Sequence, residues 1–449
     1  MSAESPLPIA IIGAGPVGLA AAAHLTERKL PCIVLEASHQ VAASFASVAH
    51  VRLFSPWRMN LDAAAVRLLE STGWKAPEAE LLPTAGEMCS RYLEPLSTML
   101  ADRIEYDARV TAITRRGYDK VRTSGREAAP FVLRVRSASS ERELEARAVI
   151  DASGTWNTPN WMGADGLPAH GELQHARCIA YGMPDILGHA RERYANRRVL
   201  VVGAGHSAAG NLIALSQLAL QATSTHIVWA VRSDTIPRSL GGGVSDGLAA
   251  RGQLGTTLRE FVTTGKLTLH LGFAAEVVTE RDGALEVAGR GGARVSGIDE
   301  IIVSTGSRPD WTAAGELRIR LDPWLESTER LAPLIDPNVH SCGSVPPHGH
   351  RELEHPEVGF CAVGAKSYGR APNFLLATGY EQARSVVAAL AGDFTAADDL
   401  QLVLPETGVC STEFVDHGGG CCTLQDAPER APSACCETPA GQSTRGCCG

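Results

Sequence analysis

The first forty residues show an ordered change from apolar to glycine-rich and back to apolar positions. An apolar run over 8–12 leads into the turn Gly13-Ala14-Gly15-Pro16-Val17-Gly18, and an alanine-rich run continues to about residue 28. A second apolar run over 31–35 ends in Glu36. Short apolar runs bounded by glycine predict buried strands, and a longer one between them predicts a helix. This stretch therefore predicts a βαβ unit.

The same order returns near the middle of the chain. Apolar residues at 199–202 precede the turn Gly203-Ala204-Gly205-His206-Ser207-Ala208, a helical pattern covers 211–220, and an apolar run covers 226–231 before Arg232. We predict a second βαβ unit here.

Further apolar runs predict the rest of the sheets. The predicted strands are 109–114, 131–135, 148–151, 300–304 and 359–363, and a long helix is predicted over about 373–390. Two of these strands end alike, in Ser153-Gly154 and in Thr305-Gly306. We therefore predict an α/β fold of two Rossmann-like dinucleotide-binding domains, with the second inserted in the first. The expected bounds are 1–163 and 306–395 for the FAD domain, 164–305 for the NADPH domain and 396–449 for a flexible, cysteine-rich tail.

The residues of the first turn suit a bound dinucleotide. Gly13 permits the tight turn, Gly15 lets the backbone approach a pyrophosphate, and Gly18 allows the helix to pack closely on the strand. The helix that follows directs its unpaired N–H groups at the phosphates. Glu36 lies 23 residues after Gly13, where a carboxylate can bind ribose hydroxyls. Because this turn leads the chain, we assign FAD to it.

The second turn differs in two informative ways. Ala208 occupies the third glycine position, which requires only a small residue. The strand after the turn ends in Arg232 and not in an acid, and a guanidinium suits a 2′-phosphate. We assign NADPH to Gly203, Gly205, Ser207, Ala208 and Arg232; the alternative is that Arg232 is an ordinary surface residue.

Charge and termini exclude some partners. The formal net charge is -9 and the sequence pI about 5.9, which gives no positive potential to attract nucleic acid or an anionic membrane. No basic region precedes the first apolar run, and glycines interrupt that run, so it predicts neither a secretory signal nor a membrane span. We expect a cytoplasmic protein.

The cysteines concentrate at the end of the chain. The sequence contains 12 cysteines, and seven of them lie in the final forty residues: Cys410, Cys421, Cys422, Cys435, Cys436, Cys447 and Cys448. Thiols of cytoplasmic proteins are normally reduced, and adjacent cysteines do not easily form a disulfide with each other. We therefore predict that the three vicinal pairs bind a thiophilic ion such as copper(I), mercury(II), arsenic(III) or antimony(III).

A second group of metal-binding residue types occurs in the loop that contains His340, Cys342, His348, His350 and His355. Its spacing matches no tetrahedral zinc pattern, and two prolines interrupt it. We favour ordinary loop residues over a metal site here.

The segments Ser153-Gly154 and Thr305-Gly306 lie where the chain passes between the two predicted domains, and we call them the first and the second crossing. The two glycine turns, the two crossings and Pro159 are similar to those of the class B flavin monooxygenases. Three stretches, 51–57, 334–338 and 366–372, resemble the flavoprotein monooxygenases encoded in bacterial arsenic-resistance clusters. The resemblance covers residues 8 to about 410, and it departs from the FxGxxxH element, where Ala169 replaces the aromatic residue. It implies that Gly154, Thr305, Gly306 and Gly364 line the cofactor sites. It further implies catalytic roles beside the flavin for Trp57, Lys366 and Arg370.

These inferences lead to one function and two alternatives. We expect an NADPH-dependent flavin monooxygenase that uses dioxygen to oxidise a small molecule with a soft heteroatom, or a trivalent arsenical or antimonite presented by the tail thiols. The first alternative is a disulfide or metal reductase that passes electrons through Cys447 and Cys448. No two cysteines have the CxxC or Cx4C spacing that such enzymes use near the flavin. The second alternative is that the tail only sequesters metal. Whether the chain forms a homodimer stays open.

Overall fold

The computed structural model describes residues 6–235, 249–339 and 345–402. The chain divides into two units, residues 1–412 and 413–449, and the second lies wholly outside the described residues. Among the residues described, none of the helices combines the length and the apolar character needed to cross a membrane.

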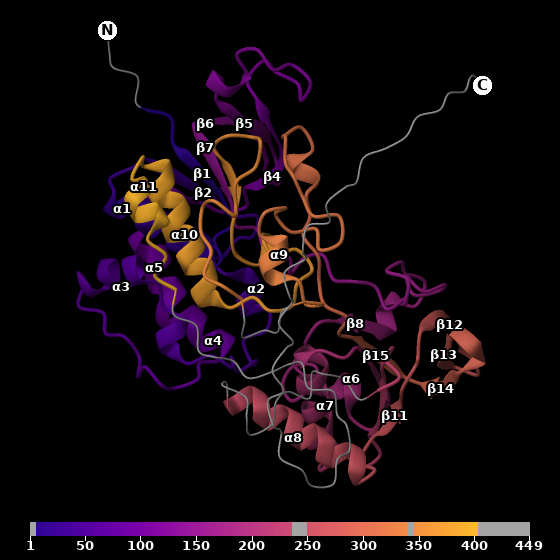
Figure 1. Ribbon diagram of the computed structural model, residues 1–449. Coiled ribbons are helices and arrows are strands. Elements are labelled where there is room, and N and C mark those ends of the chain that lie inside the picture. Colours follow the sequence, from indigo (N-terminus) through magenta and orange to yellow (C-terminus); the bar gives the residue numbers. More distant parts are fainter. Residues whose placement is uncertain (1–5, 236–248, 340–344, 403–449) are drawn as a thin grey trace, which may run out of the picture. The chain divides into compact units, whose positions relative to one another are not determined.

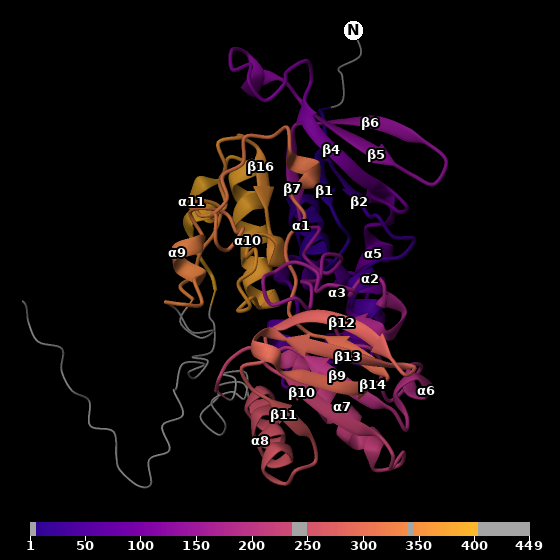
Figure 2. The same cartoon turned by 90° about the vertical axis from the view of Figure 1, so that its right-hand side faces the viewer.

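Five parallel strands form the first sheet, in the spatial order β16-β7-β1-β2-β3. Figure 2 labels β16, β7, β1 and β2 in this order. Their bounds are Ile9–Ile12 (β1), Cys32–Leu35 (β2), Ile104–Glu105 (β3), Ala148–Asp151 (β7) and Phe360–Ala362 (β16). Residues of the central strands are buried on both faces, which explains their continuous apolar sequence. The strands predicted at 8–12, 31–35, 148–151 and 359–363 are confirmed.

Helices α1 (Pro16–Glu27) and α10 (Leu376–Leu390) lie side by side (Figure 1). Their close approach depends on small residues: a Cβ at Gly379 would lie 2.6 Å from Val17 Cγ2. Any larger residue at 379 would therefore force the two helices apart.

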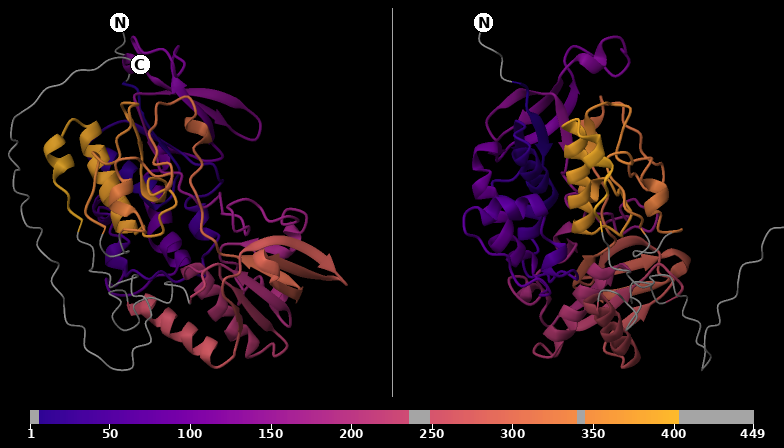
Figure 3. Two further views of the ribbon diagram at one scale, coloured as in Figure 1. Left: turned by 45° about the vertical axis from the view of Figure 1, so that its right-hand side comes forward. Right: turned by 60° about the vertical axis from the view of Figure 1, so that its left-hand side comes forward.

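A short helix, α11 (Phe394–Asp398), follows α10 and packs beside it, as the yellow ribbon of Figure 3 shows. Ser385 Oγ donates to Ala397 O at 2.7 Å. The helix spans the point where the sequence predicts the start of the tail, at residue 396.

The stretch between β2 and β3 contains several short helices, and the hydrophobic pattern predicts none of them. Its helices are α2 (Ala43–Ala46), η1 (Trp57–Met59), α3 (Ala63–Glu70), α4 (Ala85–Met88), the π-helix η2 (Cys89–Leu93), α5 (Glu94–Met99) and η3 (Ala101–Arg103). Asp62 caps α3 by accepting from Ala65 N, and its other oxygen lies 3.0 Å from Nε2 of the buried His24. This pair connects α3 to α1.

The second sheet is also parallel and has the order β11-β10-β9-β15-β8. Its strands are Ile179–Tyr181 (β8), Arg198–Val202 (β9), His226–Ala230 (β10), Thr268–His270 (β11) and Glu300–Val303 (β15). The chain leaves the first sheet after β7 and returns to it at β16, so this second sheet is inserted between them. Helix α7 (His206–Ala219) begins directly after the glycine turn, five residues earlier than predicted, and α8 (Ala249–Thr263) packs on it. The predicted fold class, with two parallel dinucleotide-type sheets, is confirmed.

Two antiparallel three-stranded sheets complete the strand pairing. One contains β4 (Arg109–Arg115), β5 (Phe131–Arg136) and β6 (Glu141–Ala146); the other contains β12 (Ala275–Arg281), β13 (Ala284–Gly289) and β14 (Arg294–Ile298). The second of these was not predicted from the sequence. Short helices α6 (Arg191–Tyr194) and α9 (Ala332–Ile335) lie in connecting segments.

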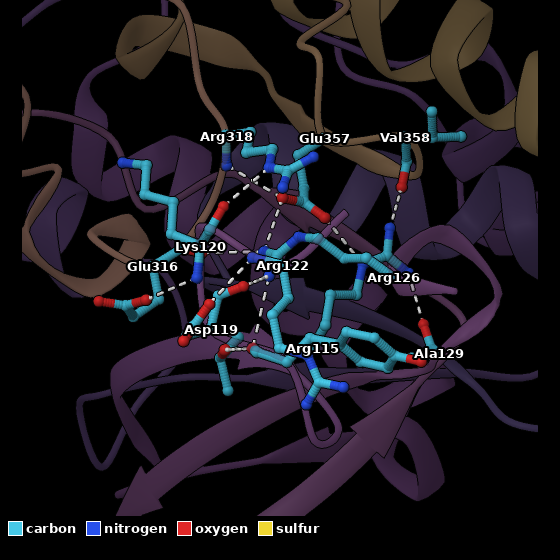
Figure 4. Close-up of polar contacts among 12 residues, drawn as sticks. Arg115, Asp119, Lys120, Arg122, Arg126, Ala129, Glu316, Arg318, Glu357 and Val358 are labelled. Carbon is cyan, nitrogen blue, oxygen red and sulfur yellow. Dashed lines mark hydrogen bonds and ion pairs between the residues drawn. The ribbon is translucent and has the colours of Figure 1, made fainter. Parts of the chain in front are cut away.

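Two arginines and one glutamate form a buried cluster beside the first antiparallel sheet (Figure 4). Arg115 Nε donates to Glu357 Oε1 at 2.8 Å, and Arg126 Nη2 donates to Glu357 Oε2 at 2.9 Å. Arg318 N donates to the same Oε2 at 2.9 Å, and the three side chains are at most 3% exposed. Burial raises the pKa of Glu357, but these hydrogen bonds outweigh it, so the pKa is lowered and the carboxylate stays ionised.

This cluster lies away from the cofactor end of the sheet. Glu357 precedes β16, whereas Gly13 follows β1 and Gly364 follows β16. The strands are parallel, so Glu357 marks the amino end of the sheet and the glycine turns mark the carboxyl end. Ligands of open α/β sheets bind at the carboxyl end, so we assign the arginine–glutamate cluster to stability.

Candidate active site

The first glycine turn has the geometry that a close phosphate approach requires. Gly13 has φ +96°, and a Cβ at Gly18 would lie 2.0 Å from Gly13 O. A Cβ at Gly15, in contrast, meets no atom within 4 Å. Gly13 and Gly18 are thus needed for the turn and its packing, while Gly15 faces open space where a ligand can approach the backbone.

The groups around this turn suit the phosphates and the ribose of a nucleotide. Gly15 caps α1 without a side-chain hydrogen bond, and no acid lies in the first helical turn. Glu36 Oε2 accepts from Ala14 N at 2.7 Å and Oε1 accepts from Ser38 N at 2.8 Å. The carboxylate therefore braces the turn, and each oxygen retains a lone pair for a ribose hydroxyl.

The second turn repeats this arrangement. Gly203 has φ +136°, and a Cβ there would lie 2.2 Å from Ser304 O, whereas a Cβ at Gly205 meets nothing within 4 Å. Ala208 is fully buried, which is why only a small residue fits. Trp229 Nε1 donates to Gly203 O at 2.8 Å and holds the turn from the next strand.

Two further residues border the second turn. His206 begins α7, and its ring centroid lies 5.4 Å from that of Phe54, which comes from the loop before η1. Arg232 follows β10 and is exposed; it donates to Ala164 O at 3.1 Å. Arg232 is thus placed at the strand end where a 2′-phosphate is expected, and its role there stays a prediction.

The two crossings between the sheets pair with each other. Asn160 N donates to Gly306 O at 2.9 Å, and Thr305 Oγ1 donates to Asn160 O at 2.8 Å. Gly154 has φ +70° and Gly306 φ +86°, a conformation that favours glycine. The structure therefore pairs Thr305 and Gly306 of the second crossing with Asn160 of the segment that follows Gly154.

The loop after β16 carries two of the predicted residues in buried positions. Gly364 has φ +70° and its N donates to Gln382 Oε1 at 2.7 Å. Lys366, in η10 (Gly364–Lys366), is 3% exposed and its Nζ lies 2.6 Å from Asp151 Oδ2. Its charge is therefore paired inside the protein and not presented on a loop.

Trp57 and Arg370 lie in different surroundings. Trp57 is 1% exposed and packs in the core of the first unit, with the Arg91 guanidinium 5.6 Å from its ring. It forms part of the wall of a cavity of about 350 Å³ that Arg52 and Glu87 also line. Arg370 is exposed, with a loose 4.0 Å ion pair to Glu326. The catalytic roles of both stay predictions.

The candidate metal ligands lie partly outside the described residues. All seven tail cysteines do, as do His340 and Cys342. The remaining histidines of the loop have separate neighbours: His348 contacts Gln382, His350 contacts Asp398, and His355 accepts from Arg320 N. Within the described ranges, no group of three acids, histidines or cysteines is arranged to hold a metal ion.

Comparison with known proteins now fixes the family. Residues 10–341 match the model of the pyridine nucleotide-disulphide oxidoreductases. The chain belongs to this family. It is therefore an oxidoreductase enzyme, as the sequence predicts, and no curated protein sequence matched it.

Solved structures of this fold include members of two functional kinds. The bacillithiol disulfide reductase of Bacillus cereus is 17% identical with a TM-score of 0.64, covering 86% of this chain and 99% of its own. DfoA, a cadaverine monooxygenase of Erwinia amylovora bound to FAD, is 13% identical with a TM-score of 0.62, at 91% and 100% coverage. The ornithine N-hydroxylase of Kutzneria sp. 744, with reduced FAD, NADP+ and L-ornithine, is 16% identical with a TM-score of 0.59, at 86% and 99%. At such identities the likeness shows a shared fold, and it does not choose between the two kinds.

Disulphide reductases of the family require reactive thiols, so the described cysteines are informative. Cys32, Cys89, Cys178 and Cys361 are all free, and they come from β2, η2, η5 (Ala176–Cys178) and β16. Burial raises the pKa of Cys32, raises that of Cys89 to about 11 and raises that of Cys361 to about 12. A thiol with a raised pKa is a poor nucleophile, so these three residues do not suit thiol–disulfide exchange.

One buried acid near the crossings was not predicted from the sequence. Glu172 is 1% exposed; it accepts from Met162 N at 2.8 Å, from Ala169 N at 2.6 Å and from the Tyr181 hydroxyl. It fixes the loop that follows the first crossing. Its signal in the sequence is its place within the altered FxGxxxH element, three residues after Ala169.

Proposed function

We propose that this enzyme uses FAD at the first glycine turn and NADPH at the second. The observation that carries the proposal is the open space above Gly15 and Gly205, each at the uncapped start of a helix. Such a turn binds a pyrophosphate through backbone N–H groups and the helix dipole. FAD, when bound, supplies a ring that accepts hydride from NADPH and passes the electrons to an acceptor.

The residues of this chain have distinct parts in that reaction. Glu36 would hold the FAD ribose, and the N–H groups at the start of α1 and α7 would hold the two pyrophosphates. Arg232 would bind the 2′-phosphate and so favour NADPH over NADH. Gly364 and the loop before α10 would lie beside the flavin. We keep the predicted bounds of the two domains as part of this proposal.

Of the two kinds of reaction known for the fold, we favour monooxygenation. The support comes from the described cysteines, which lie on four separate elements and include three with raised pKa values. A reductase would therefore depend on Cys178, on Cys342 or on the seven cysteines after residue 402. A monooxygenase requires no thiol at the flavin.

For the substrate, we propose a soft, electron-rich centre such as trivalent arsenic or antimony. The support is the three vicinal cysteine pairs of the tail, since paired thiolates prefer soft ions. With arsenite, one oxygen atom of dioxygen would join arsenic, giving arsenate. The other would leave as water with the two electrons of NADPH and two protons.

Paired variants test the cofactor assignment. Gly15→Val and Gly205→Val place the same bulk in the open space of each turn. We expect Gly15→Val to purify without flavin, and Gly205→Val to keep its flavin but lose NADPH binding. If Gly15→Val retains full flavin content, the assignment is wrong.

The reaction itself is tested with isotope-labelled dioxygen, arsenite and NADPH. One labelled oxygen atom in each arsenate, with NADPH consumed in equal amount, would support the proposal. NADPH oxidation that yields thiols from a disulfide without oxygen would support the reductase instead.

A further inference from the structure

The Lys366 ammonium has a complete set of partners inside the protein. Its Nζ donates to Asp151 Oδ2 at 2.6 Å, to Ser153 Oγ at 3.0 Å and to Asp310 O at 2.8 Å. It also lies 4.9 Å from the ring centroid of Trp311. An ammonium has three N–H donors, so these acceptors satisfy all of them.

Asp151 is equally well satisfied. Its Oδ1 accepts from Ser153 N at 3.1 Å and from Ser153 Oγ at 2.6 Å, while Oδ2 accepts from Lys366. The Lys366 and Asp151 side chains are 3% and 2% exposed. A buried ion pair adds little net stability compared with apolar residues, but it fixes the geometry of the groups that it joins.

The three acceptors come from the places where the chain passes between the two sheets. Asp151 ends β7, Ser153 begins the first crossing, and Asp310 follows the second crossing at Thr305-Gly306. Lys366 itself follows β16, which pairs with β7 through Ala362 and Asp151. One ammonium thus joins the carboxyl end of the first sheet to both crossings.

Further from Lys366, the segments that follow the two crossings are hydrogen-bonded to each other. Arg308 N donates to Thr158 O at 3.0 Å, and Ser307 Oγ donates to Thr155 Oγ1 at 2.9 Å. A displacement of either segment near Lys366 would therefore be carried along these segments to the second sheet. The start of the first crossing is also next to the first glycine turn, since a Cβ at Gly13 would lie 3.0 Å from Ala152 O.

We propose that Lys366 is a positioning residue for hydride transfer. It holds the start of the first crossing and the segment that follows the second crossing on the end of β16, and so fixes where the second sheet presents its nucleotide to the flavin. This inference rests on the proposed function. It replaces a direct electrostatic role for Lys366 at the flavin with a role exerted through Asp151, Ser153 and Asp310.

The test measures the anaerobic reduction of bound flavin by saturating NADPH in rapid-mixing experiments. Lys366→Met leaves Asp151 buried and unpaired, so the double variant Lys366→Met/Asp151→Asn is made as well to remove the charge imbalance. Ser153→Ala removes the hydrogen bonds that Ser153 Oγ makes with Lys366 Nζ and Asp151 Oδ1 but leaves the ion pair in place, so it serves as the mild variant. We expect the double variant to keep its flavin and its NADPH Kd. Its reduction rate should fall about tenfold to a hundredfold, because a small misplacement of reacting groups has effects of that size. Ser153→Ala should show a smaller fall.

Glu357→Gln is the matched control, since it weakens a buried cluster at the opposite end of the same sheet. Its reduction rate should equal that of the wild type. The inference is overturned if the double variant and Ser153→Ala both reduce at the wild-type rate, or if Glu357→Gln slows reduction equally. Failure of the proposed cofactor assignment, on which this inference rests, has another signature, because the wild-type flavin would then not be reduced by NADPH at all.

Discussion

His355 offers the sharpest pH-dependent test of the structure. The residue is 7% exposed, its Nδ1 accepts from Arg320 N at 3.2 Å, and its ring contacts those of Trp311 and Phe360. Because Nδ1 is an acceptor, the neutral ring carries its proton on Nε2. Within the described residues, Nε2 has no hydrogen-bond partner.

Protonation of this ring is disfavoured in the folded state. Burial lowers the pKa of His355 from 6.5 to about 4. A second proton would also have to occupy Nδ1, which would leave Arg320 N–H without its acceptor. The unfolded chain has no such restriction and binds its proton near the ordinary pKa.

The sign and size of the effect follow from this difference. Between the two pKa values the unfolded state binds more protons, so the stabilisation is complete above pH 6.5 and is lost as the pH falls towards 4. A shift of this size corresponds to about 3 kcal/mol in total at about 1.4 kcal/mol per unit, and about 2 kcal/mol of it is lost between about pH 7 and pH 5. Burial also lowers the pKa of His348, which contributes in the same direction.

The assay is urea unfolding of wild type and His355→Asn across this pH range at constant salt. Asparagine retains an acceptor for Arg320 N but does not titrate, so the variant should lose about 2 kcal/mol less than the wild type on acidification. His226→Asn, at an exposed position, controls for the loss of an imidazole. Equal pH dependence in wild type and His355→Asn would refute the reasoning.

Three further predictions concern the buried cluster, the nucleotide and the tail. Glu357→Ala should lower the free energy of unfolding by about 3 to 5 kcal/mol, because it leaves two buried guanidiniums without their anion; denaturation that matches the wild type would show that the cluster is dispensable. Arg232→Ala should lower kcat/KM for NADPH about tenfold. This is the low end of the effect of losing a charge-assisted contact, because the Arg232 side chain is exposed. NADH kinetics of the same variant, expected unchanged, are its control. Truncation after Leu402 keeps the contacts of Arg384 with Asp399 O and of Gln401 with Glu381, so basal NADPH oxidation should persist while turnover at low arsenite falls. A full-length variant with serine in the three vicinal pairs should behave like the truncation, and an undiminished response in both would exclude a role for the tail thiols.

The glycine turns could be predicted because their requirements are local. Gly13 and Gly203 have positive φ, and Gly15 and Gly205 lack any neighbour that a Cβ would meet. Those constraints act within a few residues of sequence. The start of α7 was misplaced at 211 because the small residues after Gly205 show no apolar period, although they are already helical.

The missed elements depend on contacts between distant parts of the chain. The helices between η1 and α5 are short, and a buried pair joins α3 to α1 through Asp62 and His24, 38 residues apart. Strands β12, β13 and β14 become a sheet only by pairing with each other. Apolar periodicity does not indicate such elements.

The residues that we expect to stabilise the fold and those that we expect to position the reactants of hydride transfer lie at opposite ends of the first sheet. At the amino end, Glu357 neutralises part of the charge of two buried arginines, and its loss is expected to change stability alone. At the carboxyl end, Lys366 and Asp151 neutralise each other, so their joint replacement by neutral residues costs little stability but releases both crossings. The sequence placed Lys366 beside the flavin as a free charge because its partner is 215 residues away. A pair that can be removed with little loss of stability, yet that joins both crossings, is therefore the place where a fall in hydride transfer can be measured without unfolding the protein.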